Sequence, residues 1–235
     1  MNAWTRDEAS RQRLGGVAAL YLALALLAAM PYFLLVVDYP GATTAAEKVA
    51  MVVGHYPSMY AMYVATYMVF GIALALLALV LHGRLRSGAP FLGQLVTAAG
   101  LLWAVALVMS GMVFTYGMTA IVALARTDAA QAVIAWRAIE PVALAVGGAG
   151  GEFLGGLWAL LLGWWALRGG DLPKALGALG VLVGVVGLAS VVPPLHDAAI
   201  AFGLLQIGWF GWLGVFLLTT RANVAVSAPA AARLA

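Results

Sequence analysis

Six apolar runs of about twenty residues, each nearly free of charge, constrain this chain more than any other feature. A helix of about twenty apolar residues is long enough to cross the hydrocarbon core of a bilayer. Such a helix also satisfies its own backbone hydrogen bonds in lipid. We therefore predict an all-α polytopic membrane protein with six transmembrane helices. The predicted spans are Gly15–Val37, Met59–Leu81, Leu92–Val113, Ala149–Leu167, Ala175–Val192 and Ala198–Thr219.

The distribution of charge between the runs predicts the orientation of the chain. With the N-terminus placed inside, nine of the twelve Lys and Arg residues and only three of the nine carboxylates fall on the inner side. This bias follows the positive-inside rule. We therefore expect both termini to be cytoplasmic, with a cytoplasmic segment at 1–14, the transmembrane domain at 15–220 and a disordered cytoplasmic tail at 221–235.

Composition and missing motifs exclude several classes of function. The basic balance of the chain comes from its topology, and no basic face interleaved with aromatic residues indicates a nucleic-acid partner. The absence of cysteine excludes disulfides, thiolate metal sites and a cysteine nucleophile. His-Glu-x-x-His, nucleophile-elbow and phosphate-loop patterns are also missing. We expect no cofactor, and a non-enzymatic role is favoured although an enzyme is left open.

Two of the predicted outer loops match each other in sequence, which predicts an internal repeat. The segment Thr43–Val49, followed by Pro57, returns 84 residues later as Thr127–Val133, followed by Pro141. This offset predicts a duplicated hairpin, with a third, loop-shortened copy as a further hypothesis. Three hairpins around an axis along the membrane normal then form the six-helix bundle.

Each copy of the repeat predicts a short interfacial helix in an outer loop. Thr44 with Glu47, and Asp128 with Gln131, have the spacing of a helix N-cap and its third residue. The apolar residues that follow are suited to lying on a membrane surface. The two helices are expected to cover the outer end of the bundle; the alternative is that they only anchor the loops to the membrane surface.

Glu152 is the main candidate for a functional side chain. It lies fifteen residues before the inner end of its predicted helix, which is about 22 Å at 1.5 Å per residue. An ionisable group at that depth is energetically expensive and is a functional hypothesis by default. Burial among glycines is expected to favour its neutral form. The alternative is a hydrogen-bonded glutamate that only joins two helices.

Four tyrosines form one face of the second predicted span. Tyr56, Tyr60, Tyr63 and Tyr67 stand at i, i+4, i+7 and i+11. An interfacial aromatic belt explains the first two residues. Tyr67 lies deeper, so the face also predicts a polar-tipped wall of an outward-facing cavity.

Other polar side chains map to the outer half of the chain. Ser110 and Gln206 lie within spans and are candidates to hydrogen-bond with Glu152. His196 and Asp197 lie at the outer surface, where Asp197 has the alternative role of a helix cap. Imidazoles with the outer methionines raise the possibility of copper, but no tight ligand motif supports it, and no metal site is predicted.

The chain resembles a family of bacterial six-helix membrane proteins that is known only as a domain of unknown function. The similarity rests on Leu172–Gly177 with Gly180 and on the closing run from Gly203 to Trp209. This resemblance implies the six-helix fold and a location in the bacterial plasma membrane. It implies no activity and no site residues.

Three hypotheses for function follow from these features. The first is a non-enzymatic module that binds a small apolar or lipidic ligand in an outward-facing pocket, or that serves as an accessory subunit of a membrane complex. Its expected partners are membrane lipids, the ligand, and a membrane-protein partner or a second copy of the chain. The second is a proton-coupled transporter that uses Glu152, and the third is a membrane-embedded enzyme that uses Glu152, Tyr67 and His196. The catalytic residues and the ligand stay unknown.

Overall fold

The structure is a computed structural model that describes residues 3–85, 90–147 and 152–220. All regular structure in these ranges is helical. Five helical segments are long and apolar enough to cross a membrane, and the helices α6 and α7 are apolar but shorter. In chain order the elements are α1 (Ala3–Pro31), the π-helical turn η1 (Tyr32–Val36), α2 (Ala45–Tyr63), the π-helical segment η2 (Val64–Val69), α3 (Phe70–Leu85), α4 (Pro90–Ala125), α5 (Ala129–Gly147), α6 (Phe153–Leu167), α7 (Lys174–Ala189), the 3-10 turn η3 (Pro193–Leu195) and α8 (Ala198–Thr219).

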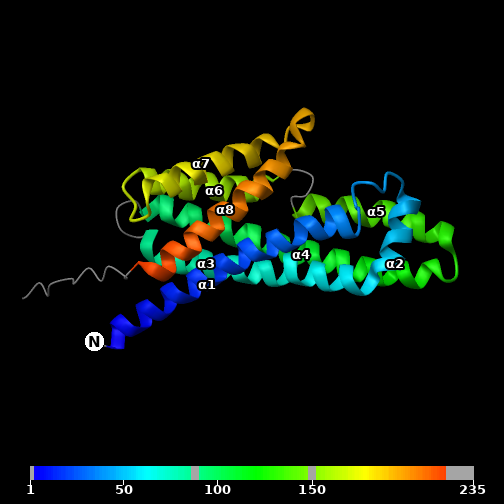
Figure 1. The fold of residues 1–235 in the computed structure, drawn as a ribbon, viewed down its shortest axis with the longest axis horizontal. Coiled ribbons are helices and arrows are strands. Elements are labelled where there is room, and N and C mark those ends of the chain that lie inside the picture. Colours follow the sequence, from blue (N-terminus) through cyan, green and yellow to red (C-terminus); the bar gives the residue numbers. More distant parts are fainter. Residues whose placement is uncertain (1–2, 86–89, 148–151, 221–235) are drawn as a thin grey trace, which may run out of the picture.

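Six helices pack in a closed ring. Following the contacts around the bundle, the order is α1, α3, α4, α6, α7 and α8, with α8 packed back on α1. Figure 1 shows these helices from the side. The centre of the ring is filled by buried aromatic side chains from four of these helices. They are Phe70, Trp103, Trp158, Trp209 and Phe210, whose neighbouring ring centroids lie 5.4 to 6.5 Å apart.

Small residues bring α6 and α7 into backbone contact. A Cβ atom added at Gly156 would lie 2.8 Å from the Leu188 nitrogen, and one added at Gly163 would lie 2.5 Å from the Val181 nitrogen. Two helices approach this closely only where neither carries a side chain at the contact. The glycines along the facing sides of α6 and α7 therefore form the packing surfaces of these two helices. They are Gly156, Gly163, Gly177, Gly180, Gly184 and Gly187.

A second core lies beyond the ring, between α2, the distal half of α4, and α5. Met59, Phe114, Met118 and Trp136 are fully buried there. The predicted span Leu92–Val113 is only part of α4, which has 36 residues and is about 54 Å long. The helix continues because residues 114–125 stay apolar and free of proline. The helix α4 therefore contributes buried side chains to both cores.

The two helices expected at the membrane surface differ from each other. The first is the beginning of α2, which bends at His55 (φ −114°, ψ 17°) and then continues through η2 into α3. The second is α5, a 19-residue helix that packs along α4 and buries Trp136. Trp136 is one of the apolar residues after Asp128 that were expected to lie on the membrane surface; instead its side chain fills the second core.

The helix expected at Ala149–Leu167 is shorter than predicted. Residues 148–151 lie outside the described residues, and α6 begins at Phe153. Both α5 and α6 pack on α4, so they follow one another along it (Figure 1). Glu152 is described and is not helical, so it interrupts the helix expected at Ala149–Leu167, at the boundary between the two cores; we call this point the helix break.

The helices α2 and α5 begin at corresponding positions. Their first residues, Ala45 and Ala129, are 84 positions apart. The Thr44 hydroxyl accepts a hydrogen bond from the Glu47 nitrogen at 3.2 Å, and the Asp128 carboxylate accepts one from the Gln131 nitrogen at 2.9 Å. The 84-residue offset noted in the loops therefore includes the starts of both helices and their N-cap hydrogen bonds.

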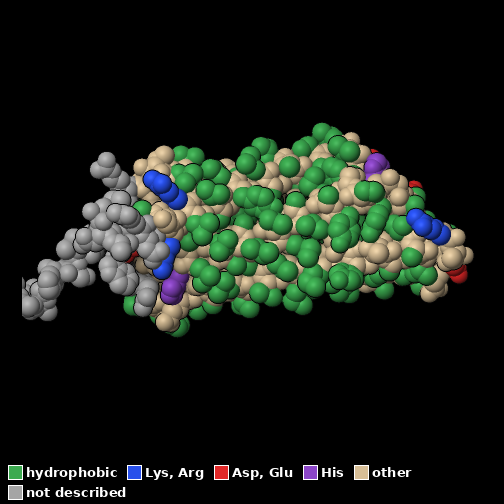
Figure 2. Space-filling view, turned by 90° about the horizontal axis from the view of Figure 1, so that it is seen from below, with side chains coloured by type: hydrophobic (Ala, Val, Ile, Leu, Met, Phe, Trp, Pro, Cys, Tyr) green, Lys and Arg blue, Asp and Glu red, His purple; other side chains and the backbone are tan. Residues whose placement is uncertain are grey.

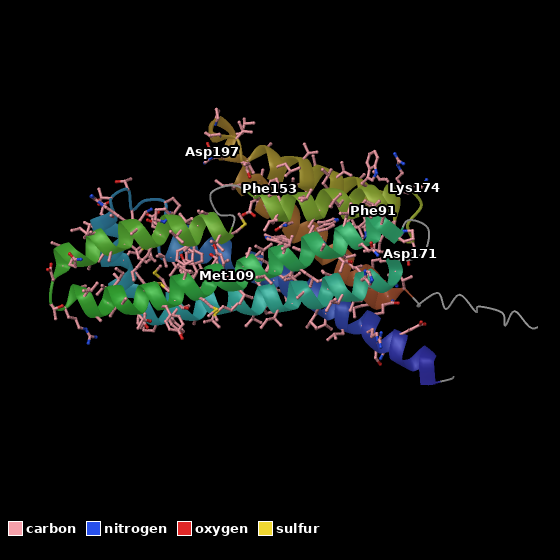
Figure 3. All side chains as sticks on the ribbon, turned by 180° about the vertical axis from the view of Figure 1, so that it is seen from behind. Phe91, Met109, Phe153, Asp171, Lys174 and Asp197 are labelled. Carbon is pink, nitrogen blue, oxygen red and sulfur yellow. The ribbon has the colours of Figure 1, made fainter. Side chains whose placement is uncertain are left out.

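The surface is apolar along its length and carries charged groups toward both ends (Figure 2). Large apolar side chains such as Leu24, Leu79 and Leu102 are exposed on the ring helices, as expected for contact with lipid. We name the two ends by their residues. At the Arg84 end, Arg84 pairs with Asp171 at 2.9 Å. The Asp197 end is an end of the ring only: it holds the turn between α7 and α8, and α2, α5 and the second half of α4 extend beyond it (Figure 3).

Candidate functional site

Glu152 occupies the helix break. It is the N-cap residue of α6, with non-helical backbone angles (φ −84°, ψ 58°), and its side chain does not cap the helix. Its backbone N–H donates to the Ser190 hydroxyl at 3.0 Å. Ser190 in turn donates to the Gly187 carbonyl at 2.7 Å and is the C-cap of α7. This arrangement places Glu152 at the Asp197 end of α6 and α7.

A pocket of about 290 Å³ opens beside Glu152. It lies where the end of α5, the start of α6 and the middle of α4 meet, and Figure 3 shows Phe153 at this junction. Apart from the carboxyl group, the lining side chains are apolar or aromatic. The lining residues are Trp103, Ala145, Val146, Gly147, Glu152, Phe153 and Leu154.

Within the described residues, the Glu152 carboxyl group has no hydrogen-bond donor and no cation as a partner. Burying an unpaired charge in an apolar environment costs far more than burying a paired one. A carboxyl group held in this way is available to a ligand, because no internal contact must first be broken.

Tyr67 is the one member of the predicted tyrosine face that lies near Glu152. The two side chains are close enough to interact electrostatically. A Cβ atom added at Gly147 would lie 2.8 Å from the Tyr67 ring, so glycine at this position lets the ring pack behind the pocket wall. Tyr67 also packs on Tyr63 and Phe114, with ring centroids 5.5 and 5.8 Å apart.

The other tyrosines do not line the pocket. Tyr63 is buried in the second core, stacked on Phe114 at 4.2 Å. Tyr60 is 38% exposed and meets Tyr56 edge to face. The predicted cavity wall therefore reduces to Tyr67, and that residue stands behind Gly147.

The remaining predicted polar residues are not brought to Glu152. Ser110 is fully buried and donates to the Ala143 carbonyl at 2.7 Å, which joins α4 to α5. Gln206 is buried on α8, and its side-chain nitrogen has no partner among the described residues. His196 and Asp197 are exposed at the turn between α7 and α8, where Asp197 makes no capping hydrogen bond. Asp197 therefore holds the N-cap position of α8, as expected, but its side chain does not bond to the first turn of the helix.

The described residues contain no group of three or more His, Asp or Glu side chains placed to hold a metal ion. Two of the outer methionines, Met59 and Met118, are fully buried in the second core. Their thioethers therefore serve as packing groups.

Trp103 and Phe153 are the pocket residues that sequence analysis missed. Trp103 lies in the middle of an apolar run and is 4% exposed, so the pattern gives it only a packing role. The available signal was the glycine-rich stretch around Gly147 and Gly151, which interrupts an apolar run beside an acidic residue. Glycine in an apolar run can indicate a point where a transmembrane helix is interrupted, and not only a point of close helix packing.

A second polar cluster holds α5 in place. Lys48 on α2 pairs with Glu140 on α5 at 2.6 Å, and its ammonium group lies 5.1 Å from the centre of the Tyr39 ring. The Tyr39 hydroxyl donates a hydrogen bond to Glu140. Burial, followed by this hydrogen bond, raises the pKa of Tyr39. The cluster fixes the helix whose last turn forms one wall of the pocket.

Comparison with known proteins gives no relative. No protein-family model, no curated protein and no solved structure matches the chain.

Proposed function

We propose that this protein is an integral membrane module that binds a small apolar or lipidic ligand beside Glu152 and does not catalyse a reaction. The observation that carries the proposal is an unpaired carboxyl group in an otherwise apolar pocket of about 290 Å³. Small-molecule sites are concave and mostly apolar, with a few polar groups that orient the ligand. Their usual volume begins at about 300 Å³, so this pocket suits one ring or head group.

The position of the pocket supports entry from the bilayer. Phe153 is 53% exposed and Ala145 is also exposed, so the pocket reaches the surface that the ring presents to lipid. A ligand with an apolar tail can place its head group in the pocket and leave the tail among acyl chains.

The two alternatives receive less support from the packing. A transporter needs a polar route past the pocket, whereas Trp158, Trp209 and Phe210 fill the bundle between the pocket and the Arg84 end. An enzyme built on Glu152, Tyr67 and His196 needs these side chains to converge, and His196 lies on an exposed turn. An accessory subunit remains compatible with ligand binding.

The proposal includes a membrane topology. We propose six spans in three hairpins with both termini inside, so that the Asp197 end faces outward and the Arg84 end faces the cytoplasm of a bacterium. The ring order and the 84-residue correspondence of α2 with α5 support the hairpins and the repeat. The surplus of Lys and Arg on the proposed inner side supports the orientation.

Quenching of tryptophan fluorescence by bromododecanol tests the proposed binding. The purified protein in phosphatidylcholine nanodiscs is expected to show saturable quenching, because bromine in the pocket contacts Trp103. Ala145→Phe fills the pocket from its exposed wall and should abolish the saturable component. Ala138→Phe, an equally exposed change two turns earlier on α5, is the matched control. Equal saturable quenching in both variants would overturn the proposal.

A further inference from the structure

The pocket combines one carboxyl group with aromatic walls. Glu152 shares the pocket with Trp103 and Phe153, and the Tyr67 ring packs behind Gly147. Aromatic faces attract cations through the ring quadrupole, most strongly when the site is shielded from water. A carboxylate adds direct charge attraction, and acidic groups within membrane proteins are commonly paired with a cation. The side chains therefore complement a positive charge better than a neutral or negative head group.

The proposed outer side of the chain carries more acidic than cationic residues even without Glu152. Five other carboxylates lie toward that side, against three of the twelve cationic residues. Of those three, Lys48 is already paired with Glu140. A surplus of negative charge on one side of a protein speeds the approach of cations to that side, whereas the preference at the pocket depends on the groups that line it.

From these observations we infer that the ligand is a lipophilic organic cation, an ammonium head group on an apolar tail, whose head pairs with Glu152 between Trp103 and Phe153. The inference rests on the proposed function, because it names the ligand class of the same pocket. Binding forms a compact ion pair that supplies the partner missing from the carboxyl group. The tail lies past the exposed Phe153 side chain, among acyl chains.

An anionic amphiphile does not suit this pocket. A fatty carboxylate would place two acidic groups in one apolar site, where like charges repel strongly. A neutral alcohol suits the volume but leaves the carboxyl group without a counter-ion.

Three brominated probes with the same tail length test the inference. They are bromododecyltrimethylammonium, bromododecanol and bromododecanoate, each measured by saturable quenching in nanodiscs of zwitterionic lipid. The cation is expected to bind about tenfold more tightly than the alcohol. The carboxylate is expected to bind more weakly than both.

Substitutions at the pocket identify the group responsible. Glu152→Gln keeps the shape of the side chain and removes its charge, so the preference for the cation should fall to about onefold while the alcohol still binds. Asp197→Asn removes an exposed acidic group at the same end and should leave the preference unchanged. Phe153→Leu should weaken the cation more than the alcohol.

The outcomes separate the two proposals. If Ala145→Phe blocks the alcohol but wild type shows no preference for the cation, the ligand class is wrong and the binding function stands. If the preference persists in Glu152→Gln, the cation is held elsewhere and the inference is overturned. If no probe shows saturable quenching, the binding function itself fails.

Discussion

The Lys48 ammonium and the Glu140 carboxylate form an ion pair of 2.6 Å that joins α2 to α5. Their side chains are 23% and 10% exposed, so the pair is largely withdrawn from water. Tyr39 donates a further hydrogen bond to the same carboxylate. The loop before α2, the helix α2 and the helix α5 therefore meet at the Glu140 carboxylate, although Tyr39 and Glu140 are 101 positions apart in sequence.

Removing the charge of Glu140 is expected to destabilise the fold. Glu140→Gln leaves Lys48 without its counter-ion in a largely buried site, so the free energy of unfolding should fall by about 2 kcal/mol. Thermal denaturation of the purified protein measures the change. Asp171→Asn is the control, because Asp171 is 42% exposed in its pair with Arg84 and its loss should cost less than about 1 kcal/mol. Equal melting temperatures for Glu140→Gln and wild type would contradict a stabilising role of the Lys48–Glu140 ion pair.

The raised pKa of Tyr39 predicts a loss of stability in alkaline solution. Below about pH 10 the phenol is neutral in both the folded and unfolded states, and the stabilisation is fully present. Above that value the unfolded chain loses the proton first, so the free energy of unfolding falls as pH rises. Melting temperatures measured on either side of this value should decline more steeply for wild type than for Tyr39→Phe. Parallel pH profiles would show that Tyr39 does not contribute.

Close packing of α6 on α7 predicts a large effect from one methyl group. In Gly163→Ala the added carbon would lie 2.5 Å from the Val181 nitrogen and 2.6 Å from the Gly177 carbonyl oxygen, so the helices must separate. Overpacking of this kind costs about 1–3 kcal/mol. Gly208→Ala is the matched change, since no atom lies within 4 Å of its added carbon. Thermal denaturation should show a lower melting temperature for the first variant only.

The absence of cysteine makes the proposed orientation directly testable. Asp197→Cys and Arg168→Cys introduce single thiols at exposed positions on opposite ends of the bundle. In intact cells a membrane-impermeant maleimide should label only the thiol at 197, and permeabilisation should expose the one at 168. The reverse pattern would invert the topology and place the pocket toward the cytoplasm.

The sequence predicts the helical class and the positions of most apolar helices, because hydropathy and length act locally along the chain. It also predicts the N-caps at Thr44 and Asp128, whose partners lie three residues away. The extension of α4 to Ala125 was not predicted, because an apolar run does not show where the bilayer ends and a second protein core begins.

The candidate site was predicted only in part. Glu152 stands out because an acidic residue is rare in an apolar run. Its neighbour Trp103 is contributed by another helix, and only the packing of α4 against the break between α5 and α6 brings it to the pocket. Gln206 and Ser110 were selected for their depth alone. Ser110 bonds to the Ala143 carbonyl instead, and the buried side-chain nitrogen of Gln206 has no partner among the described residues.

If the proposed function holds, the indole and phenyl rings along the bundle axis determine the route by which a bound ligand enters and leaves the pocket. A molecule seated beside Glu152 has Trp158 and Phe210 between it and the Arg84 end, so it departs by the route along which it arrived. Its occupancy then follows equilibrium with the lipid and solution at the Asp197 end, and a gradient across the membrane does not drive it. Under the proposed binding function, the protein would therefore sense or buffer its ligand and would not transport it against a gradient.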